Sequence, residues 1–307
     1  MDFRPLTVND AEAIRPFFQN LRSRTCDLTL GCMLMWSDFY RQEYAVFEDI
    51  LFVAYYDENG EKYYALPIGE DDSKILKGID LLCRYEEEKG KVEKAKFCAI
   101  PKEYLPLFEK MQRSFTPLPQ VDFFDYLYAA DDMKLLKGKK FNGQRNHINK
   151  FRKTATEWHL EEIGPDNIKD AEEFLRNTYK KADGNISAED EYNSSEENAM
   201  VLDVLKNYSI YGFCGAILYA DGAPVGFSIG EILGDTLFVH IEKADRNYPG
   251  AYQMLVNQFA LKFASEDINF INREDDMRDE GLRKSKLSYH PIEILEKFTL
   301  EELKSNN

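Results

Sequence analysis

The stretch GFCGAILYADGAPVGFSIGEILGDTLFVHIEKA, residues 212–244, decides the fold class of this chain. Its apolar segments are separated by the dipeptides Asp221-Gly222 and Gly234-Asp235. Such dipeptides favour two-residue hairpin turns, because Gly, Asn and Asp tolerate the positive φ that these turns require. The stretch therefore predicts three antiparallel strands, over 212–220, 223–233 and 236–244.

The same kind of unit occurs twice along the 307 residues. LTVNDAEAIRPFF, residues 6–18, matches IGPDNIKDAEEFL, residues 163–175, since each ends a short strand, offers Asn or Asp as an N-cap and begins an amphipathic helix. In the first half, two apolar runs flank Asn59-Gly60, a third hairpin dipeptide. Each half is therefore expected to contain an antiparallel meander.

Each meander is followed by elements in the same order. The periodicity predicts a helix (73–89 and 252–264), a strand (95–100 and 268–272), another helix (102–112 and 277–286) and a final strand (121–129 and 291–298). The expected fold class is α+β, with two tandem domains that each hold a mixed, mostly antiparallel sheet flanked by helices. The expected division is an N-terminal domain over 1–130, a basic linker helix over 131–155 and a C-terminal, catalytic domain over 156–307.

Composition excludes several classes of protein. With 44% hydrophobic and 13% aromatic residues, the chain has enough apolar side chains for the packed cores of about two domains. No apolar run approaches the roughly 20 residues of a membrane-spanning helix. The first residues include Asp2 and Arg4 and form no signal-peptide core, so a cytoplasmic protein is expected. The five cysteines and four histidines lack metal-ligand spacing, and no metal is expected.

One segment departs from the acidic character of the chain. The net charge is −16, from 39 Lys and Arg against 55 Asp and Glu. KLLKGKKFNGQRNHINKFRK, residues 134–153, holds eight of the basic residues and no acidic one, so the rest of the chain carries −24. Such a run is often only a solvated helix face. Here Phe141, Ile148 and Phe151 can anchor one face while basic residues reach outward, which favours a phosphate-bearing partner: lone phosphates, coenzyme A or an RNA backbone.

The pentapeptide Gly226-Phe227-Ser228-Ile229-Gly230 fits the G-x-S-x-G pattern of a serine-hydrolase nucleophile. That nucleophile requires a strand, a sharp turn and then a helix. The pentapeptide lies instead within an alternating strand that continues to Leu233. It is therefore interpreted as strand, and Ser228 as no nucleophile.

Residues 236–253, TLFVHIEKADRNYPGAYQ, predict a strand, a short loop and the start of a helix. Arg246 to Ala251 come near to the pattern R-x-x-G-x-[GA], and the free N–H groups of a helix N-terminus bind anions. Pro249 occupies the first glycine position and removes one donor, and Gly250 follows it. An ordinary strand-to-helix turn is the alternative interpretation.

The hairpin at Gly234-Asp235 also predicts a register. If two residues form the turn, Glu231, His240 and Glu242 share one face of the sheet. A carboxylate that is partly buried there would have a raised pKa and could take a proton from an attacking amine. An ordinary exposed face is the alternative.

A last polar cluster follows the strand at 268–272. Asn272, Arg273 and Glu274 lie at its end, where sheets often place ligand contacts. Asp275 and Asp276 are expected to cap the next helix, and Tyr289 follows that helix as a proton donor.

Three segments together resemble the DUF2156 family: QRNHINKFRK (144–153), HIEKADRNYPGAYQ (240–253) and NREDDMRDEGLRKSKLSYHP (272–291). This family is similar to the C-terminal domain of phosphatidylglycerol lysyltransferases. The resemblance covers nearly the whole chain and implies two tandem GNAT-like (N-acyltransferase) folds, an arrangement shared with the Fem peptidyltransferases, which use aminoacyl-tRNA. It also implies that the loop 246–251 holds the pyrophosphate of a donor and that the basic segment resembles the helix joining the two halves of Fem-type enzymes.

The expected function is that of an acyl- or aminoacyltransferase, which moves an activated acyl group to an amine or hydroxyl acceptor. Glu242 or Glu231 would act as the base and Tyr289 as the acid, while backbone N–H groups of the donor strand polarise the carbonyl. The donor would be held by Arg246, Gly250, Ala251, Tyr252 and Asn272. Phosphate groups would be held by Arg145, Asn146, Lys150, Arg152, Arg273 and Lys286.

Two donors and one rival function stay open on the sequence. The loop slightly favours a coenzyme A thioester, and the basic segment favours aminoacyl-tRNA, bound through residues 134–153. The rival is a non-catalytic GNAT-like module that binds acyl-CoA, a nucleotide or RNA.

Overall fold

The computed structural model describes residues 1–19, 21–89, 94–179 and 188–303. The chain divides into two compact units. The first consists of Met1–Asp125, Asp275–Arg278 and Ile294–Asn307, and the second of Tyr126–Glu274 and Asp279–Glu293. In the described part of the chain, no helix is both long and apolar enough to cross a membrane.

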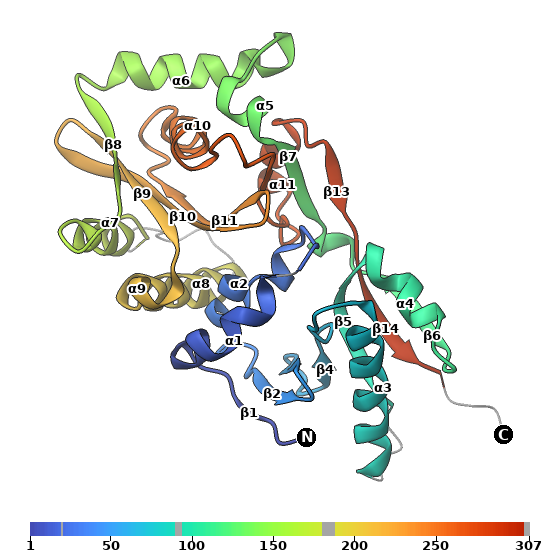
Figure 1. Cartoon of the computed structure of the whole chain (residues 1–307). Helices are drawn as coiled ribbons and strands as arrows, with labels where there is room; N and C mark the ends of the chain where they lie inside the picture. Colours follow the sequence, from blue (N-terminus) through green and yellow to red (C-terminus); the bar gives the residue numbers. More distant parts are fainter. Residues whose placement is uncertain (20, 90–93, 180–187, 304–307) are drawn as a thin grey trace. The chain divides into compact units, whose positions relative to one another are not determined.

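The first sheet has seven strands in the order β1-β2-β3-β4-β5-β14-β6 (Figure 1). Neighbours are antiparallel except β4 and β5, which are parallel. The strands are β1 (Arg4–Pro5), β2 (Glu43–Phe47), β3 (Ile50–Tyr56), β4 (Lys62–Tyr64), β5 (Lys96–Pro101), β14 (Lys297–Glu302) and β6 (Phe115–Pro119). The helices of this part are η1 (Val8–Asp10), α1 (Ala11–Phe18), η2 (Cys26–Leu28), α2 (Leu30–Met35), α3 (Asp72–Glu88), η3 (Lys102–Tyr104), α4 (Leu105–Glu109) and η4 (Val121–Phe123).

The second sheet repeats this plan, in the order β13-β7-β12-β11-β10-β9-β8. Here β11 and β12 form the parallel pair. The strands are β13 (Glu293–Leu295), β7 (Asp125–Ala129), β12 (Phe270–Asn272), β11 (Thr236–Ala244), β10 (Ala223–Leu233), β9 (Cys214–Ala220) and β8 (Trp158–Glu162). The helices are α5 (Ala130–Leu135), η5 (Lys139–Phe141), α6 (Asn142–Thr154), α7 (Ile168–Tyr179), α8 (Ala188–Lys206), α9 (Tyr208–Tyr211), α10 (Ala251–Phe263) and α11 (Glu280–Leu287).

The predicted duplication is confirmed, but the final strands are exchanged. Each sheet pairs four antiparallel strands, then a parallel neighbour, and then a strand supplied from far along the chain. In the first sheet that strand is β14, from the end of the chain, and in the second it is β7. The prediction that each half keeps its own final strand was wrong, because apolar alternation specifies a strand without specifying its sheet. The units therefore differ by these strands from the division expected at 130–155.

The turns of the second meander follow the prediction. Asp221 and Gly222 have φ of 51° and 79°, as the hairpin dipeptide requires. Leu233 pairs with Thr236 across the turn at Gly234-Asp235. The α+β class with a mixed, mostly antiparallel sheet in each half is therefore confirmed.

One helix begins later than expected. The helix predicted over 277–286 is α11, whose N-cap is Asp279, with its side chain accepting a bond of 2.6 Å from the N–H of Leu282. Asp275 and Asp276 accept from the N–H groups two residues ahead of each, so they form turns and do not cap the helix. The helix predicted over 102–112 is likewise limited to η3 and the short α4.

The sheet of the second unit is covered on both faces (Figure 1). On one face, α10 lies on β9, β10 and β11, and α6 packs on α10. Phe141, Phe151, Leu237 and Phe259 belong to the core between them. On the other face, α7 lies on β10, where the rings of Phe174 and Phe227 are 6.1 Å apart, and α8 packs on α7.

Candidate functional site

The centre of the candidate site is a β-bulge at His240 in β11. Glu231 pairs with Phe238 as predicted, but Gly230 pairs with Val239 and Ile229 with Ile241, so His240 has no partner in the ladder. Gly230 allows this close approach, because a Cβ on it would lie 2.1 Å from the carbonyl oxygen of Phe238. Bulges often occur beside active sites, where they change the direction of a side chain.

The bulge corrects the predicted sheet face. Beyond it, Glu242 pairs with Ser228 and Lys243 with Phe227, and residues directly opposite each other share a face. Glu231 lies two places from Ile229 along β10 and is therefore on the other face from Glu242. The prediction that Glu231, His240 and Glu242 share one face was wrong, because one extra residue inverts the alternation.

The two parallel strands diverge at the same point. β11 pairs with β12 from Thr236 to Phe238, and β12 ends at Asn272. β11 continues to Ala244, and within the described residues no strand pairs with this continuation on the side of β12. That side of the continuation therefore has no strand opposite it among the described residues.

On the α7 face, His240 lies between two carboxylates. Its side chain is fully buried, with Nε2 2.9 Å from Glu231 Oε1 and Nδ1 2.7 Å from Glu274 Oε1. Burial opposes the charged form, but the hydrogen bonds and charges of the two glutamates raise the pKa of His240 to about 10. His240 is therefore an imidazolium at neutral pH that fixes both glutamates.

On the α10 face, Glu242 pairs with Arg273. The guanidinium donates from Nε at 3.1 Å and from Nη2 at 2.5 Å, and both bonds go to Oε2 of Glu242. The Arg273 side chain is only 5% exposed and that of Glu242 15%. Oε1 of Glu242 accepts no hydrogen bond from the described residues. Glu242 thus has one oxygen held and one oxygen available.

Aromatic rings and a buried lysine hold Arg273 in place. Its guanidinium carbon lies 4.9 Å from the ring centre of Tyr289 and 5.9 Å from that of Tyr128. Lys286 donates to the backbone carbonyl of Arg273 at 2.5 Å, and Tyr128 donates to the carbonyl of Lys286 at 2.9 Å. Lys286, expected to bind phosphate, is buried and holds the backbone instead.

Tyr289 is 3% exposed, and its hydroxyl makes no hydrogen bond with the described residues. Burial raises its pKa above the ordinary range, although the nearby Arg273 acts in the opposite direction. The fully buried Asn272, expected to contact the donor, accepts from the N–H of Glu274 at 2.6 Å. Asn272 therefore shapes the turn that sends Arg273 and Glu274 to opposite faces.

The loop at the start of α10 lies against α6. Gly250 is the N-cap of α10 with φ of 82°, and a Cβ on it would lie 2.1 Å from the carbonyl oxygen of His147. The rings of Tyr248 and Phe151 are 5.2 Å apart. The glycine is therefore required by the packing of α6 on the loop. Of the other residues expected there, Arg246 is exposed, Ala251 is buried and Tyr252 is half-buried.

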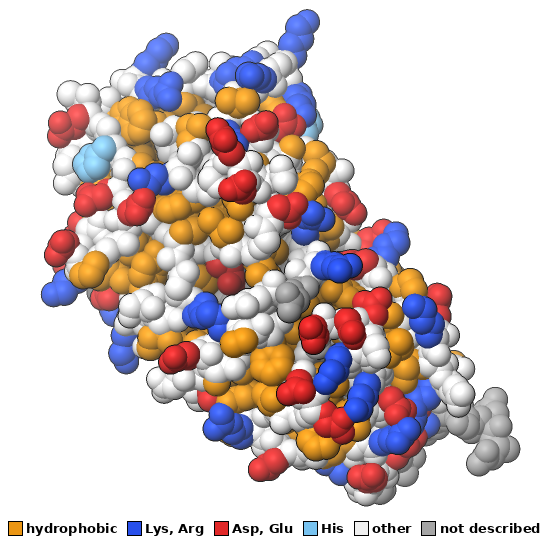
Figure 2. Space-filling view, in the orientation of Figure 1, with side chains coloured by type: hydrophobic (Ala, Val, Ile, Leu, Met, Phe, Trp, Pro, Cys, Tyr) orange, Lys and Arg blue, Asp and Glu red, His pale blue; other side chains and the backbone are white. Residues whose placement is uncertain are grey.

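The basic segment forms the turn after α5 and then α6. Phe141, Ile148 and Phe151 are buried, as the sequence predicted. Asn146, Lys150, Arg152 and Lys153 are exposed. Figure 2 shows Lys and Arg side chains gathered over α6 and the turn that leads into it.

Arg145 differs from these exposed residues. It is half-buried and donates to the carbonyl of Leu136 and to Oδ1 of Asn142. It therefore fastens the end of α5 to the start of α6.

The G-x-S-x-G pentapeptide lies inside β10, as the sequence indicated. Ser228 is fully buried and donates to the carbonyl of Ile241 at 2.9 Å. It is therefore a strand residue bonded across the ladder.

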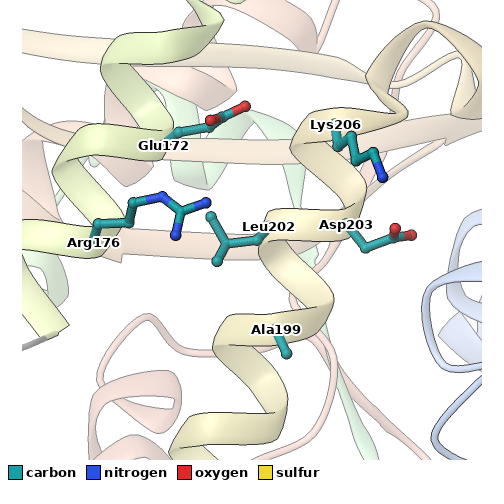
Figure 3. A pocket seen from close by; sticks show the side chains of 6 residues that line it. All are labelled: Glu172, Arg176, Ala199, Leu202, Asp203 and Lys206. Atoms are coloured by element: carbon teal, nitrogen blue, oxygen red, sulfur yellow. The ribbon is translucent and has the colours of Figure 1, made fainter.

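A hollow of about 300 Å³ lies between α7 and α8, away from the bulge. Figure 3 shows Arg176 of α7 pointing toward Leu202 of α8, while Asp203 and Lys206 point away from α7. In ligand sites a few polar groups converge on the cavity, and this hollow lacks such an arrangement.

One group of potential metal ligands lies in the first unit. Cys26, Asp27 and Asp125 bring their ligand atoms within 4.8 Å of one another. The ammonium of Lys297 lies among them, 2.5 Å from Asp27 and 2.7 Å from Asp125. The lysine supplies the positive charge that a metal would supply in such a group.

The two mixed sheets, the parallel pair that diverges and the helix that follows β11 define a tandem GNAT-like protein. The solved structure of FemX has the same arrangement over 98% of this chain and 96% of that chain, with a TM-score of 0.50 and 10% identity. Residues 18–301 match the family described as "Phosphatidylglycerol lysyltransferase, C-terminal", so the chain belongs to that family. The resemblance found in the three sequence segments is thereby confirmed.

Individual relatives match the chain to different extents. A conserved protein of unknown function from Bacteroides thetaiotaomicron is 30% identical, with a TM-score of 0.85 over 99% of this chain and 100% of that one. L-PGS from Bacillus licheniformis has a TM-score of 0.65 and 14% identity over 96% of this chain and 92% of that chain. The uncharacterized protein MYCGA3080 of Mycoplasmoides gallisepticum is 25% identical over 181 residues, and the match spans 58% of this chain but only 56% of that relative.

Sequence reasoning missed the pairing within the site. His240 was expected on the shared face but not as the centre of a carboxylate pair, and Tyr128 was not expected at all. One signal could have indicated the bulge: Gly230 interrupts a strand of large apolar residues, and an isolated glycine in a strand suggests a bulge. The partners of Arg273 and Glu274 depend on the divergence of two strands and leave no local pattern.

Proposed function

We propose that the second unit is an aminoacyltransferase, which moves an aminoacyl group from aminoacyl-tRNA to an amine or hydroxyl acceptor with Glu242 as the base. Membership of a family described by lysyl transfer supports an activated aminoacyl donor. The observation that carries the proposal is the available Oε1 of Glu242, beside the part of β11 that has left β12.

Glu242 is oriented for proton transfer. Two bonds from Arg273 hold Oε2, so the direction of Oε1 is fixed. An acceptor amine or hydroxyl loses its proton to Oε1 as it attacks the acyl carbon. Glu231, the other expected base, is held by His240 on the opposite face, so Glu242 is the base in this proposal.

The backbone of β11 stabilises the negative charge that develops on the acyl oxygen. N–H groups beyond Phe238 that point away from β10 have no described strand opposite them. Fixed N–H donors of this kind stabilise an oxyanion without reorganising during the reaction.

Tyr289 protonates the leaving group. The ester bond between the acyl carbon and the ribose oxygen breaks, and that oxygen takes the proton of the Tyr289 hydroxyl. The raised pKa keeps this phenol protonated, and Arg273 beneath the ring favours the phenolate that forms. Proton exchange from Glu242 to Tyr289 through solvent restores both groups.

The position of α6 favours tRNA over coenzyme A as the donor. The backbone of α6 lies against Gly250, at the end of the loop 246–251 that was expected to hold the donor. The exposed side chains of Lys150, Arg152 and Lys153 follow along α6 from this point. A single coenzyme A occupies only the loop, whereas a polynucleotide backbone can continue along these cations.

The test is turnover with each donor. Purified protein is incubated with tRNA charged with labelled amino acids, or with labelled acyl-CoA, and with amines, peptides and phosphatidylglycerol vesicles as acceptors. We expect transfer from aminoacyl-tRNA that Glu242→Gln lowers by about a hundredfold or more, since general-base catalysis contributes about 10²–10⁴-fold. Glu266→Gln, a matched change at an exposed glutamate after α10, should leave the rate unchanged.

The same assay distinguishes the rivals. Transfer from acyl-CoA alone would replace the proposed donor and keep the enzyme. Binding of charged tRNA without transfer to any acceptor would instead indicate a non-catalytic module. The double variant Lys150→Glu with Arg152→Glu should lower the affinity for tRNA and make that affinity less dependent on salt. The control is Lys169→Glu with Lys206→Glu, which changes exposed lysines on α7 and α8 and should lower the affinity for tRNA far less.

A further inference from the structure

Two cysteines lie close together in the first unit. Cys26 is in η2 and Cys32 is in the first turn of α2, and their sulfur atoms lie within 4.8 Å of each other. Between them in the sequence, the hydroxyl of Thr29 donates to the carbonyl of Cys26 at 2.8 Å and accepts from the N–H of Cys32 at 3.2 Å. The threonine therefore fixes the backbones of the two cysteines relative to each other.

The two thiols differ in their access to solvent. Cys26 is 4% exposed, whereas Cys32 is half-buried. A hydrogen bond with Cys32, burial and two nearby carboxylates raise the pKa of the Cys26 thiol, although the ammonium of Lys297 acts in the opposite direction. A dissolved oxidant therefore reaches Cys32 first, while Cys26 stays protonated behind it.

Charged groups surround the sulfur of Cys26. It lies 3.4 Å from Oδ1 of Asp125 and 3.7 Å from Oδ2 of Asp27. Nζ of Lys297 lies 3.6 Å from the same sulfur. A buried cysteine that only fills space in apolar surroundings is inert, whereas reactive cysteines lie beside charged groups. Here a carboxylate can take the proton of the thiol, and an ammonium can stabilise the thiolate that forms.

We propose that Cys32 and Cys26 form a redox site that reduces a hydroperoxide and closes a reversible disulfide. A solvent-accessible cysteine beside a second, resolving cysteine is the arrangement found in redox sensors. The site belongs to the first unit, so it goes beyond the proposed transfer reaction and does not require it.

The reaction has two steps, written here for hydrogen peroxide. The sulfur of Cys32 attacks one oxygen of the peroxide, the O–O bond breaks, and Cys32 becomes a sulfenic acid as one water leaves. The sulfur of Cys26 then attacks the sulfur of Cys32, and the S–O bond breaks. Oδ1 of Asp125 takes the proton of Cys26 and passes it to the departing hydroxide, which leaves as the second water. The two thiols lose two electrons and two protons, and the peroxide gains them.

The folded chain can accommodate the disulfide. Bonded sulfur atoms are about 2.05 Å apart, so those of Cys26 and Cys32 need to approach by about 3 Å at most. The buried carboxylate of Asp125 keeps two other partners after the thiol is oxidised. These are the N–H of Cys26 at 2.7 Å and the ammonium of Lys297 at 2.7 Å.

Peptide mapping tests the proposal with the whole chain. Arg24 and Arg41 are trypsin sites with no Lys or Arg between them, so residues 25–41 form one peptide that carries both cysteines. The protein is treated with a small excess of hydrogen peroxide, alkylated and digested. We expect this peptide to lack alkyl groups and to be about 2 Da lighter than its reduced form, and dithiothreitol should restore both thiols.

Single variants separate the two steps. Cys26→Ser keeps a hydroxyl beside Asp125, and it should accumulate a sulfenic acid at Cys32 that dimedone traps, because the resolving thiol is missing. Cys32→Ser should form no bridge and give about tenfold less dimedone adduct in residues 25–41. Cys98→Ser and Cys214→Ser change half-buried cysteines elsewhere and should leave the bridge unchanged.

Three results would overturn the proposal. The first is that both thiols of residues 25–41 are still alkylated after peroxide treatment. The second is a bridge from Cys32 to another cysteine, such as Cys98, in place of Cys26. The third is a dimedone adduct at Cys26 in Cys32→Ser that forms as readily as the adduct at Cys32 in Cys26→Ser, since the order of the two steps would then be wrong.

Discussion

Oε2 of Glu242 accepts two hydrogen bonds from Arg273, 3.1 Å from Nε and 2.5 Å from Nη2, in a site where the arginine side chain is 5% exposed. Little water therefore reaches the ion pair. Its partners come from different strands, β11 and the residue after β12, so it bridges the point at which the parallel pair diverges.

Removal of this arginine should be costly for stability. Arg273→Met leaves the largely buried Glu242 without its partner, and such a loss costs about 3–5 kcal/mol. Urea denaturation should show this decrease in the free energy of unfolding, whereas Arg152→Met on the exposed face of α6 should stay within about 0.5 kcal/mol. Equal, small changes in both variants would mean that the ion pair does not hold the site together.

Two glycines with the same backbone conformation should respond differently to alanine. Gly222 has φ of 79° and open space around it, so Gly222→Ala should cost about 1–2 kcal/mol from the left-handed conformation alone. Gly250 has φ of 82°, but its added Cβ would lie 2.1 Å from the carbonyl oxygen of His147. Gly250→Ala should therefore cost about 1–3 kcal/mol more, from displacement of α6. Thermal unfolding of both variants measures the difference, and similar losses would show that α6 does not press on the loop.

The stability of the second unit should fall at high pH because of His240. Its pKa of about 10 in the folded state lies above the ordinary 6.5, so the folded state binds the proton more tightly. The resulting stability is fully present below about pH 6.5 and is lost as pH rises to about 10, with a slope of about 1.4 kcal/mol per pH unit. In His240→Gln this dependence on pH should be absent, and the difference between the two proteins measures it.

NMR spectroscopy tests directly whether His240 is an imidazolium. The ring carbon and nitrogen shifts of His240 in an NMR spectrum at pH 8 should be those of an imidazolium. A neutral ring at that pH would contradict the arrangement in which both glutamates are charged and bonded to it.

In the first unit, two lysine pairs of the same length should differ in energy. Lys297 lies 2.5 Å from Asp27 with its side chain 1% exposed, and Lys102 lies 2.5 Å from Glu296 with its side chain 62% exposed. Lys297→Met removes the ammonium that lies 2.7 Å from the fully buried Asp125 and should cost about 3–5 kcal/mol. Lys102→Met should cost at most about 1 kcal/mol. Chemical denaturation compares them, and a mild effect at Lys297 would contradict its assigned role.

Much of the fold follows from local pattern. The hairpin dipeptides and apolar alternation of residues 212–244 predicted three strands that the structure contains with nearly the same bounds. The exchange of β7 and β14 could not be predicted in this way, because pairing between distant strands depends on both sheets at once. The order of elements along the chain is the same whether or not the strands are exchanged.

The sequence allowed residues of a candidate site to be named, but it did not predict their geometry. The ends of β11 and β12 were expected to carry functional side chains, and Glu242, Arg273 and Tyr289 do come together there. The extra residue at His240 inverts the face of every later residue in β11, and Gly230 is the one local signal that could have indicated it. Arg145 and Lys286 were expected to bind phosphate because they are basic, but each bonds a backbone carbonyl, which only the folded chain shows.

The central claim is that an aminoacyl group binds where β11 leaves β12, with Glu242 at the reacting carbon. The most direct measurement is a crystal structure with an RNA minihelix whose terminal adenosine carries an amide-linked amino acid, a stable analogue of the donor. The account predicts the acyl carbonyl within hydrogen-bond distance of a β11 N–H beyond Phe238, Oε1 of Glu242 facing the acyl carbon, and RNA phosphates near Lys150 and Arg152. Density for the aminoacyl group at another place, with Glu242 remote from it, would contradict the account.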